Sequence, residues 1–331
     1  MKVAVLKETI ANESRVGLVP DGVKFLKKKG LEAVVEKGAG LAAGFPDAAY
    51  EAEGASIAPD ASAAASGADF VFKVQPPTVD EVGTLSKGQI LLSSLQPVMA
   101  LDIVKALRDA GITTMAMDLM PRITRAQSMD ILSSQATVAG YKAVLLGANA
   151  IGKFLPMLTT AAGTVRPAKT LTLGAGVAGL QVLATFRRLG AVMEAFDVRP
   201  AVKEQCESLG AKFLELDVGD MEDEGGYAKE LSEDQHKQEM EMITESLKDK
   251  DIVITTAQIP GRTAPTLITK AMVEGMKPGS AIVDLAAETG GNCELTVAGE
   301  TVEHNCVKIL GPVNLAATMP FHASMMFSKN L

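Results

Sequence analysis

The segment Thr170-Leu171-Thr172-Leu173-Gly174-Ala175-Gly176-Val177-Ala178-Gly179-Leu180-Gln181-Val182-Leu183 reads as a short apolar strand, a Gly-x-Gly-x-x-Gly turn and a helix. Gly174 permits a tight turn, Gly176 lets a pyrophosphate approach the backbone, and Gly179 lets the helix pack closely on its strand. The N-terminal amides of such a helix face the anion. The segment therefore predicts a dinucleotide-binding turn, against the alternative of a glycine-rich turn in an ordinary α/β domain.

An acidic residue follows the next predicted strand at the spacing that this turn requires. The strand runs from Val192 to Phe196 and is followed by Asp197, which lies 23 residues after Gly174, where the usual spacing is about 20. A carboxylate there accepts hydrogen bonds from the adenine ribose and repels a 2′-phosphate, so it favours NAD(H) over NADP(H). The neighbouring Arg199 weakens this preference.

Length and composition limit the classes of protein to consider. A chain of 331 residues favours two domains, and 47% hydrophobic but only 4% aromatic residues suit α/β packing. The net charge of -8 argues against nucleic acid as a partner. Cys206, Cys293 and Cys306 lack metal-ligand spacing and are expected to be reduced thiols of an intracellular chain. The longest uncharged stretch, 309–328, contains two prolines, so no insertion into a membrane is expected.

Strand and helix patterns alternate along the first half of the chain, which predicts a parallel sheet wrapped by helices. The predicted strands here are 3–6, 33–36, 69–74, 90–95 and 113–117, and the predicted helices are 22–29, 48–53 and 98–110. A long helix over 128–155 is expected to join this domain to the one that contains the glycine turn. Further strands are expected at 212–216, 252–255, 281–284 and 307–310, and a C-terminal helix beginning near Pro320 is expected to return to the first domain.

A polar loop precedes the long helix and contains the most distinctive group of candidate site residues. It reads Met120-Pro121-Arg122-Ile123-Thr124-Arg125-Ala126-Gln127-Ser128-Met129-Asp130. Loops after strands are where α/β sheets bind ligands, so Arg122, Gln127 and Asp130 are candidates to face one cleft. The alternative is that Asp130 or Ser128 caps the helix and Arg122 pairs with it.

A second segment, between Asp217 and Asp251, is highly charged, contains Gly225-Gly226-Tyr227 among acidic residues and is expected to lead into a polar helix. It is either a solvated surface segment or a mobile lid with one aromatic contact. General bases are scarce elsewhere: His236, His304 and His322 are expected to be structural or solvated, and no Ser/His/Asp set, HExxH or P-loop is present.

Four stretches together resemble the NAD(H)-binding component of proton-translocating nicotinamide nucleotide transhydrogenase. They are the polar loop 120–130, the glycine turn with Asp197-Val198-Arg199, the segment 225–230, and Asp284-Leu285-Ala286-Ala287-Glu288-Thr289-Gly290-Gly291-Asn292-Cys293. The resemblance covers essentially the whole chain. It implies two Rossmann-like, doubly wound parallel-sheet domains with a cleft between them, joined by the long helix. The expected domains are 1–132 with about 314–331, and 133–313.

The resemblance also implies roles for individual residues. Arg122, Gln127 and Asp130 would position the nicotinamide and its ribose, and Tyr227 would lie on a mobile loop that closes over NAD(H). The other residues that it assigns to the cofactor are Ser133, Gly174, Gly176, Val177, Gly179, Asp197, Val198, Arg199, Gly226, Thr256, Ala257 and Gln258. No metal is expected.

Alanine dehydrogenase is a close relative of that family, and it binds pyruvate with an arginine, a lysine and a histidine. Those places align with Arg15, Gln75 and Gln96, so only the arginine is retained. Hydride exchange between two nicotinamides needs neither a carboxylate clamp nor a base, because the protein only has to hold the rings together and exclude water. The missing groups favour the transhydrogenase interpretation.

The chain has one credible dinucleotide fingerprint, so a second nucleotide must come from elsewhere. The resemblance implies a Re/Si-specific, proton-translocating NAD(P) transhydrogenase in which NADP(H) is held by a partner domain and protons move through a separate membrane-spanning domain. It further implies a homodimer that is soluble but peripheral at the cytoplasmic face of a bacterial inner membrane, or on the mitochondrial matrix side. The alternatives are an alanine-type amino-acid dehydrogenase and an NAD(H)-sensing binding module.

Overall fold

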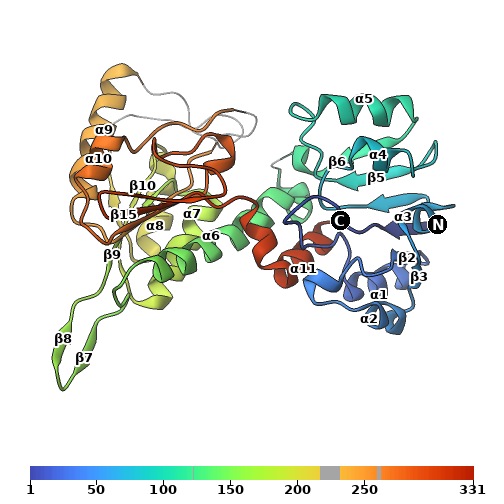
Figure 1. The fold of residues 1–331 in the computed structure, drawn as a ribbon, viewed down its shortest axis with the longest axis horizontal. Helices are drawn as coiled ribbons and strands as arrows, with labels where there is room; N and C mark the ends of the chain where they lie inside the picture. The colour runs from blue at the N-terminus through green and yellow to red at the C-terminus, as the bar shows by residue number, and fades with distance from the viewer. Residues whose placement is uncertain (122, 217–231, 259–261) are drawn as a thin grey trace. The chain divides into compact units, whose positions relative to one another are not determined.

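The chain folds into two compact units, each built on its own sheet (Figure 1). The computed structural model describes residues 1–121, 123–216, 232–258 and 262–331. The first unit comprises residues 1–138 and 316–331, and the second comprises residues 139–315. The predicted α/β class with two doubly wound domains is confirmed, and each unit is described below by itself.

The first unit contains a six-stranded sheet in the order β3-β2-β1-β4-β5-β6, with every neighbouring pair parallel. This order reverses direction next to β1, which is the doubly wound arrangement of dinucleotide-binding folds. The strands are β1 (Lys2–Val5), β2 (Glu32–Glu36), β3 (Ser56–Ala58), β4 (Phe70–Phe72), β5 (Ile90–Ser93) and β6 (Thr113–Ala116). The helices are α1 (Pro20–Lys28), α2 (Asp47–Glu53), α3 (Ala61–Ala65), α4 (Val79–Val82), α5 (Leu101–Asp109) and α11 (Pro320–Asn330), with short 3₁₀ turns η1 (Leu41–Ala43), η2 (Met117–Leu119), η3 (Thr124–Met129) and η6 (Leu315–Thr318).

The second unit contains a seven-stranded sheet in the order β11-β10-β9-β12-β13-β15-β14. Its strands are β9 (Lys169–Leu173), β10 (Val192–Phe196), β11 (Lys212–Leu214), β12 (Ile252–Thr255), β13 (Ala281–Asp284), β14 (Thr301–His304) and β15 (Val307–Leu310). Its helices are α6 (Ile131–Ala150), which begins in the first unit, α7 (Val177–Leu189), α8 (Lys203–Ser208), α9 (Glu233–Leu247) and α10 (Lys270–Glu274), with 3₁₀ turns η4 (Pro200–Val202) and η5 (Ala287–Thr289). The sheet is parallel except for the edge strand β14, which pairs antiparallel with β15 and was not predicted.

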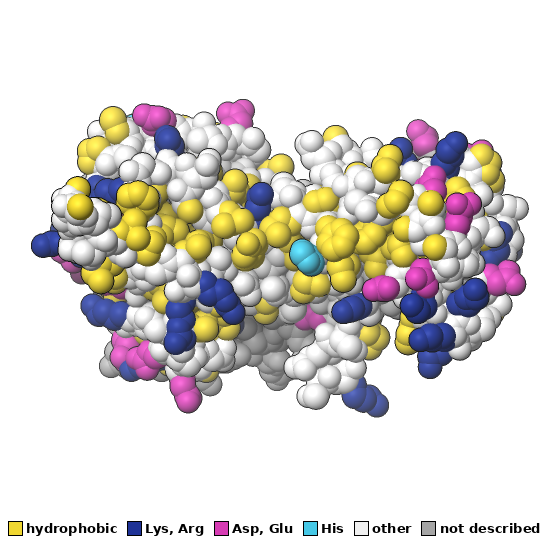
Figure 2. Space-filling model, turned by 90° about the horizontal axis from the view of Figure 1, so that it is seen from below, with side chains coloured by type: hydrophobic (Ala, Val, Ile, Leu, Met, Phe, Trp, Pro, Cys, Tyr) yellow, Lys and Arg dark blue, Asp and Glu magenta, His cyan; other side chains and the backbone are white. Residues whose placement is uncertain are grey.

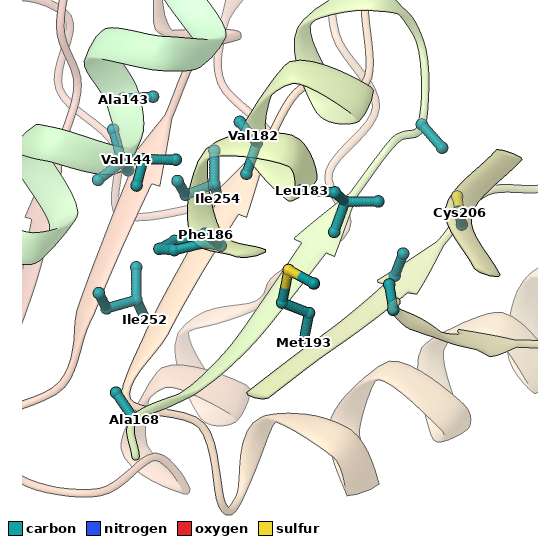
Figure 3. Close-up of a cluster of buried hydrophobic side chains, with 14 of the residues drawn as sticks. Ala143, Val144, Ala168, Val182, Leu183, Phe186, Met193, Cys206, Ile252 and Ile254 are labelled. Carbon is teal, nitrogen blue, oxygen red and sulfur yellow. The ribbon is translucent and has the colours of Figure 1, made fainter. Parts of the chain in front are cut away.

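Alternate residues of the central strands enter the cores on the two faces of the second sheet. Ile252 and Ile254 of β12 lie in the cluster formed with α6, α7 and α8, whereas Val253 lies in the cluster formed with α9 and α10. Figure 3 shows the first cluster, where Val144 of α6 and Phe186 of α7 lie beside Ile254. Burial on both faces explains why these strands are continuous apolar runs rather than alternating ones.

The helix that links the two units is shorter than predicted. It runs over Ile131–Ala150 rather than over 128–155. Its start is fixed by Asp130, and the preceding Thr124–Met129 forms a 3₁₀ turn instead. The helix ends shortly before Gly152 and Pro156. Glycine disfavours the helical conformation at its own position, and proline disfavours it at the residue before. An antiparallel hairpin, β7 (Leu158–Thr160) with β8 (Gly163–Val165), follows and was also not predicted.

The C-terminal helix α11 returns to the first unit, as predicted. Its Ser324 and Ser328 hydroxyls accept hydrogen bonds from the backbone N–H groups of Val16 (3.0 Å) and Val19 (3.2 Å).

Within the described residues, no helix combines the length and the apolar character needed to cross a membrane. On the face drawn in Figure 2, Lys and Arg side chains are interspersed with Asp and Glu.

Candidate functional site

The glycine turn between β9 and α7 depends on three glycines for three different reasons. Gly174 has a φ of +92°, which a side chain would strain. A Cβ at Gly179 would lie 1.9 Å from the Gly174 carbonyl oxygen, so the first turn of α7 can approach the strand only without a side chain there. Among the described residues other than its chain neighbours, a Cβ at Gly176 would meet no atom within 4 Å. The space beside Gly176 is therefore open to a ligand, at the end of a helix whose first amides have no intrahelical acceptor.

Asp197 ties the end of β10 to this turn. Its Oδ2 accepts a hydrogen bond from the Ala175 N–H at 2.7 Å, and its Oδ1 accepts one from the Arg199 N–H at 2.9 Å. The Arg199 guanidinium adds two more bonds, from Nε to Oδ1 at 2.8 Å and from Nη2 to Oδ2 at 2.7 Å. A ribose hydroxyl would therefore have to share the Asp197 carboxylate with Arg199 or displace the guanidinium from it. This contact is the structural reason why Arg199 weakens the expected preference for NAD(H) over NADP(H).

The end of β12 lies on the other side of the turn. Thr256 donates its backbone N–H to the Leu173 carbonyl at 2.8 Å and its hydroxyl to the Gly174 carbonyl at 3.0 Å. Because β9 lies between β10 and β12, the turn is at the point where the strand order reverses, which is where open α/β sheets bind ligands. The fingerprint turn, Asp197 and Thr256 are thus brought together within the second unit.

The remaining candidates of the second unit surround this point. Val177 is the first residue of α7 and is 38% exposed, and Val198 packs against the core cluster on the α9 face. Gln258 is exposed and its amide donates to the Leu285 carbonyl at 2.9 Å. Ala257 donates its N–H to the Asn292 side chain at 3.1 Å. Gly226, Tyr227 and the predicted lid lie outside the described residues.

Asp284 and Asn292 form a buried polar group to which the sequence alone assigned no individual role. The Asp284 carboxylate has no exposed surface and accepts hydrogen bonds from the hydroxyls of Thr255 and Thr296 and from three backbone N–H groups. The three N–H donors belong to Ala286, Asn292 and Cys293. An acidic residue at the end of an apolar strand, followed by Gly290-Gly291-Asn292, was the available signal.

In the first unit, the structure joins two of the predicted site residues. Asp130 Oδ1 accepts a hydrogen bond from the Ser133 N–H at 2.9 Å, and Oδ2 accepts one from the Ser133 hydroxyl at 2.6 Å. Asp130 therefore caps α6, and the capping alternative is confirmed for it. Gln127 is exposed, and its carbonyl accepts a hydrogen bond from the Asp130 N–H at 3.3 Å. Arg122 lies outside the described residues.

The positions that align with the pyruvate-binding groups of alanine dehydrogenase are also in the first unit. Arg15 donates from Nε and Nη2 to Glu13 and from Nη1 to the Gln135 side chain. Gln75 donates its amide to the same Glu13 at 2.8 Å. The Glu13 carboxylate thus accepts hydrogen bonds from both Arg15 and Gln75. Gln96 has a φ of +47°, and its N–H donates to Asp118.

Two of the cysteines are buried, and each of the three histidines contacts a neighbouring side chain. Burial raises the pKa of Cys206 and of Cys293 to about 11, so both stay protonated near neutral pH. His236 bonds to Glu239 and His304 to Glu274, and the His322 ring packs edge-on against Phe321. Within the portion of the chain that the structure describes, no three His, Cys, Asp or Glu side chains are grouped to hold a metal.

Two doubly wound units, one of them with a glycine turn and an acidic residue at the reversal of strand order, define a protein of the Rossmann class. Two family descriptions match it: the alanine dehydrogenase/PNT N-terminal domain over residues 4–139 and the alanine dehydrogenase/PNT C-terminal domain over residues 143–331. The chain belongs to the alanine dehydrogenase/PNT family.

Individual relatives agree with this assignment. The chain is 50% identical over 339 residues to the first portion of NAD(P) transhydrogenase subunit alpha of Rhodospirillum rubrum, covering 100% of this chain and 88% of that protein. A solved transhydrogenase structure from Sinorhizobium meliloti superposes with a TM-score of 0.90 at 45% identity, covering 100% of this chain and 92% of that one. An L-alanine dehydrogenase structure gives a TM-score of 0.83 at 28% identity, covering 99% and 86%.

The different surroundings of Gly179 and Gly176 lead to a matched pair of substitutions. Gly179→Ala should destabilise the protein by about 3 kcal/mol, because its Cβ collides with a backbone carbonyl that cannot move aside. Gly176→Ala should change stability by no more than about 1 kcal/mol, because alanine adopts a φ of -71° without strain and no described side chain or backbone atom lies where its Cβ would be. Urea unfolding measures both, and equal effects would contradict the assignment of the close contact to Gly179.

Proposed function

We propose that this chain is the NAD(H)-binding component of a proton-translocating, Re/Si-specific NAD(P) transhydrogenase. In this proposal hydride passes directly between NAD(H) bound here and NADP(H) bound to a partner domain. The observation that carries the proposal is the 50% identity, over the whole chain, to a protein named as a portion of NAD(P) transhydrogenase subunit alpha. The open glycine turn at the strand-order reversal supports it independently.

The second unit supplies the groups for the dinucleotide. The pyrophosphate fits the open space beside Gly176, where the N-terminus of α7 offers backbone amides and the positive end of its dipole. Asp197 then recognises the adenosine ribose, with Val198 and Arg199 beside it. The nicotinamide half crosses β9 to the end of β12 at Thr256-Ala257-Gln258, with Gly226 and Tyr227 closing over the cofactor. For this domain we propose the bounds 133–313, which begin six residues before the second unit of the structure and end two residues before its end.

The first domain, 1–132 with about 314–331, contributes positioning groups in this proposal. A bound nicotinamide donates or accepts hydride at C4, and no protein base is required. Gln127 and Arg122 of this domain would hold the nicotinamide and its ribose, together with Ser133 at the start of the second domain. Asp130 orients Ser133 through the two hydrogen bonds between them. The work of these residues is to fix the ring and exclude water from it.

Partners complete the reaction. NADP(H) would be held by a separate domain, and a membrane-spanning domain would couple proton passage to the redox step. The chain itself would form a homodimer and associate peripherally with the membrane complex, on the cytoplasmic face of a bacterial inner membrane or the matrix side of a mitochondrial one.

An alanine-type dehydrogenase is the second candidate, favoured by the 28% identical structure. Two observations weigh against it. Gln75 and Gln96 replace the lysine and the histidine, and Glu13 engages both Arg15 and Gln75. An NAD(H)-sensing module is the third candidate and would bind the nucleotide without transferring hydride.

One assay separates these candidates. The purified chain is mixed with an isolated NADP(H)-binding transhydrogenase domain, and reduction of an NAD analogue by NADPH is followed beside each protein alone. We expect turnover only in the mixture. NADH oxidation by this chain alone with pyruvate and ammonium would identify an alanine-type enzyme instead. NADH binding without transfer in the mixture would favour the sensing module.

Replacing Asp197 tests the adenosine side of the site. Asp197→Ala should weaken NADH binding by about 1–3 kcal/mol, because a charge-assisted hydrogen bond to the ribose is lost. It should also relax discrimination against NADPH, because Arg199 loses its carboxylate partner and becomes available to a 2′-phosphate. Titration with both nucleotides measures the change, and unchanged selectivity would place the ribose elsewhere.

Replacing Gln127 tests the first domain. Gln127→Ala should slow hydride transfer in the mixed assay by about tenfold while leaving NADH affinity within about twofold, because it removes positioning rather than binding. The neighbouring exposed Thr124→Ala is the matched control and should change neither quantity. An equal loss of affinity and of transfer rate would refute a positioning role.

A further inference from the structure

Asn292 has no exposed surface, and all three of its side-chain hydrogen bonds go to the segment that follows β12. Its Oδ1 accepts from the Ala257 N–H at 3.1 Å, and its Nδ2 donates to the Ala257 carbonyl at 2.9 Å and to the Pro265 carbonyl at 2.8 Å. The amide therefore satisfies both backbone groups of Ala257 and reaches the far end of the same segment. A side chain that pairs with both groups of one peptide residue imitates a neighbouring strand.

The backbone of Asn292 is itself held in place by the Asp284 carboxylate. Its N–H donates to Asp284 Oδ2 at 2.7 Å, and the Cys293 N–H donates to the same oxygen at 3.0 Å. Thr255, which directly precedes Thr256, donates its hydroxyl to Asp284 Oδ1 at 2.8 Å. The Asp284 carboxylate therefore links the last residue of β12 to the loop that contains Asn292.

The turn before Asn292 is shaped to bring it to this position. Gly290 and Gly291 have φ values of +106° and +83°, and a Cβ at Gly291 would lie 2.9 Å from Asp284 Oδ2. The chain thus folds closely around the carboxylate before it presents the Asn292 amide. Gln258 adds one more link between the two segments through its bond to the Leu285 carbonyl.

We propose that Asn292 is a positioning residue that fixes the Thr256-Ala257-Gln258 segment for the nicotinamide half of the dinucleotide, with Asp284 as its support. The inference rests on the proposed NAD(H) site. Asp197 and the glycine turn lie on the β10 and β9 side, so the adenosine half needs only that side. The nicotinamide half must cross to β12, where Asn292 acts. Loss of the Asn292 side chain should therefore weaken binding of the nicotinamide half and leave binding of the adenosine half unchanged.

The test compares NADH with AMP, which contains only the adenosine half, by titrating the full chain with each. Asn292→Asp keeps the shape and one acceptor but removes both donors, so carboxylate oxygens face two carbonyls. We expect NADH affinity to fall by about tenfold or more and AMP affinity to stay within about twofold. Asn292→Ala should show the same separation.

Ser280→Ala is the matched control. Ser280 is similarly buried, lies directly before β13 at the end opposite Asp284, and donates its hydroxyl to the Lys277 carbonyl at 2.7 Å. Its loss should lower stability without changing affinity for either nucleotide. If NADH and AMP affinities fall together in Asn292→Asp, or if neither falls, the positioning role is overturned.

A measurement on the unaltered chain covers the case in which the variants do not fold. Hydrogen exchange should show the Ala257 amide protected before any nucleotide is added, because Asn292 already holds it. Rapid exchange of that amide in the nucleotide-free chain would overturn the proposal. Failure of the unaltered chain to bind NADH would instead refute the proposed function, so the two failures are distinguishable.

Discussion

The contact between the Gly174 carbonyl and Gly179 is the constraint on which the second unit depends. The first turn of α7 can lie against the end of β9 only because position 179 has no Cβ, which would be 1.9 Å from that oxygen. This approach leaves the Gly174 carbonyl to accept the Thr256 hydroxyl and leaves the Ala175 N–H to donate to Asp197. One close backbone contact thereby determines how the ends of β10 and β12 meet the turn.

Local sequence was sufficient to predict most of the architecture. Buried parallel strands such as β12 and β13 are apolar at every position before their last residue, so they were predicted as apolar runs. The elements that were not predicted include the short strand β3, the short helices α3, α4, α8 and α10, and three strands that lack an apolar run. The hairpin β7–β8 is mostly exposed and β14 alternates between exposed and half-buried residues, so neither forms an apolar run.

The candidate site likewise contains residues that a local pattern identifies and residues that only the folded structure brings together. The glycine turn and Asp197 are 23 residues apart and belong to one strand–helix–strand unit, so a fixed spacing identifies them. Asn292 and Ala257 are 35 residues apart and meet only because β12 and β13 pair in parallel. No local pattern announces such a contact. Asp130 illustrates the opposite case, in which a residue chosen as a site candidate also serves as a helix cap.

Carboxylates that accept backbone N–H groups recur where loops follow strands in both units. Glu8, after β1, accepts the N–H groups of Val74 and Gln75, and Asp118, after β6, accepts those of Leu95 and Gln96. Asp197 and Asp284 do the same in the second unit. Burial raises the pKa of Glu8, which Lys73 opposes through an ion pair at 3.5 Å.

An ionised carboxylate accepts several N–H donors at once without offering a competing donor, so it can fix an irregular loop more firmly than an amide or hydroxyl could. Parallel sheets place their ligand-binding loops at the strand ends where these carboxylates lie. These four carboxylates are therefore part of the framework that holds those loops, and the backbone N–H groups of Gln75 and Gln96 are among the groups that they bind.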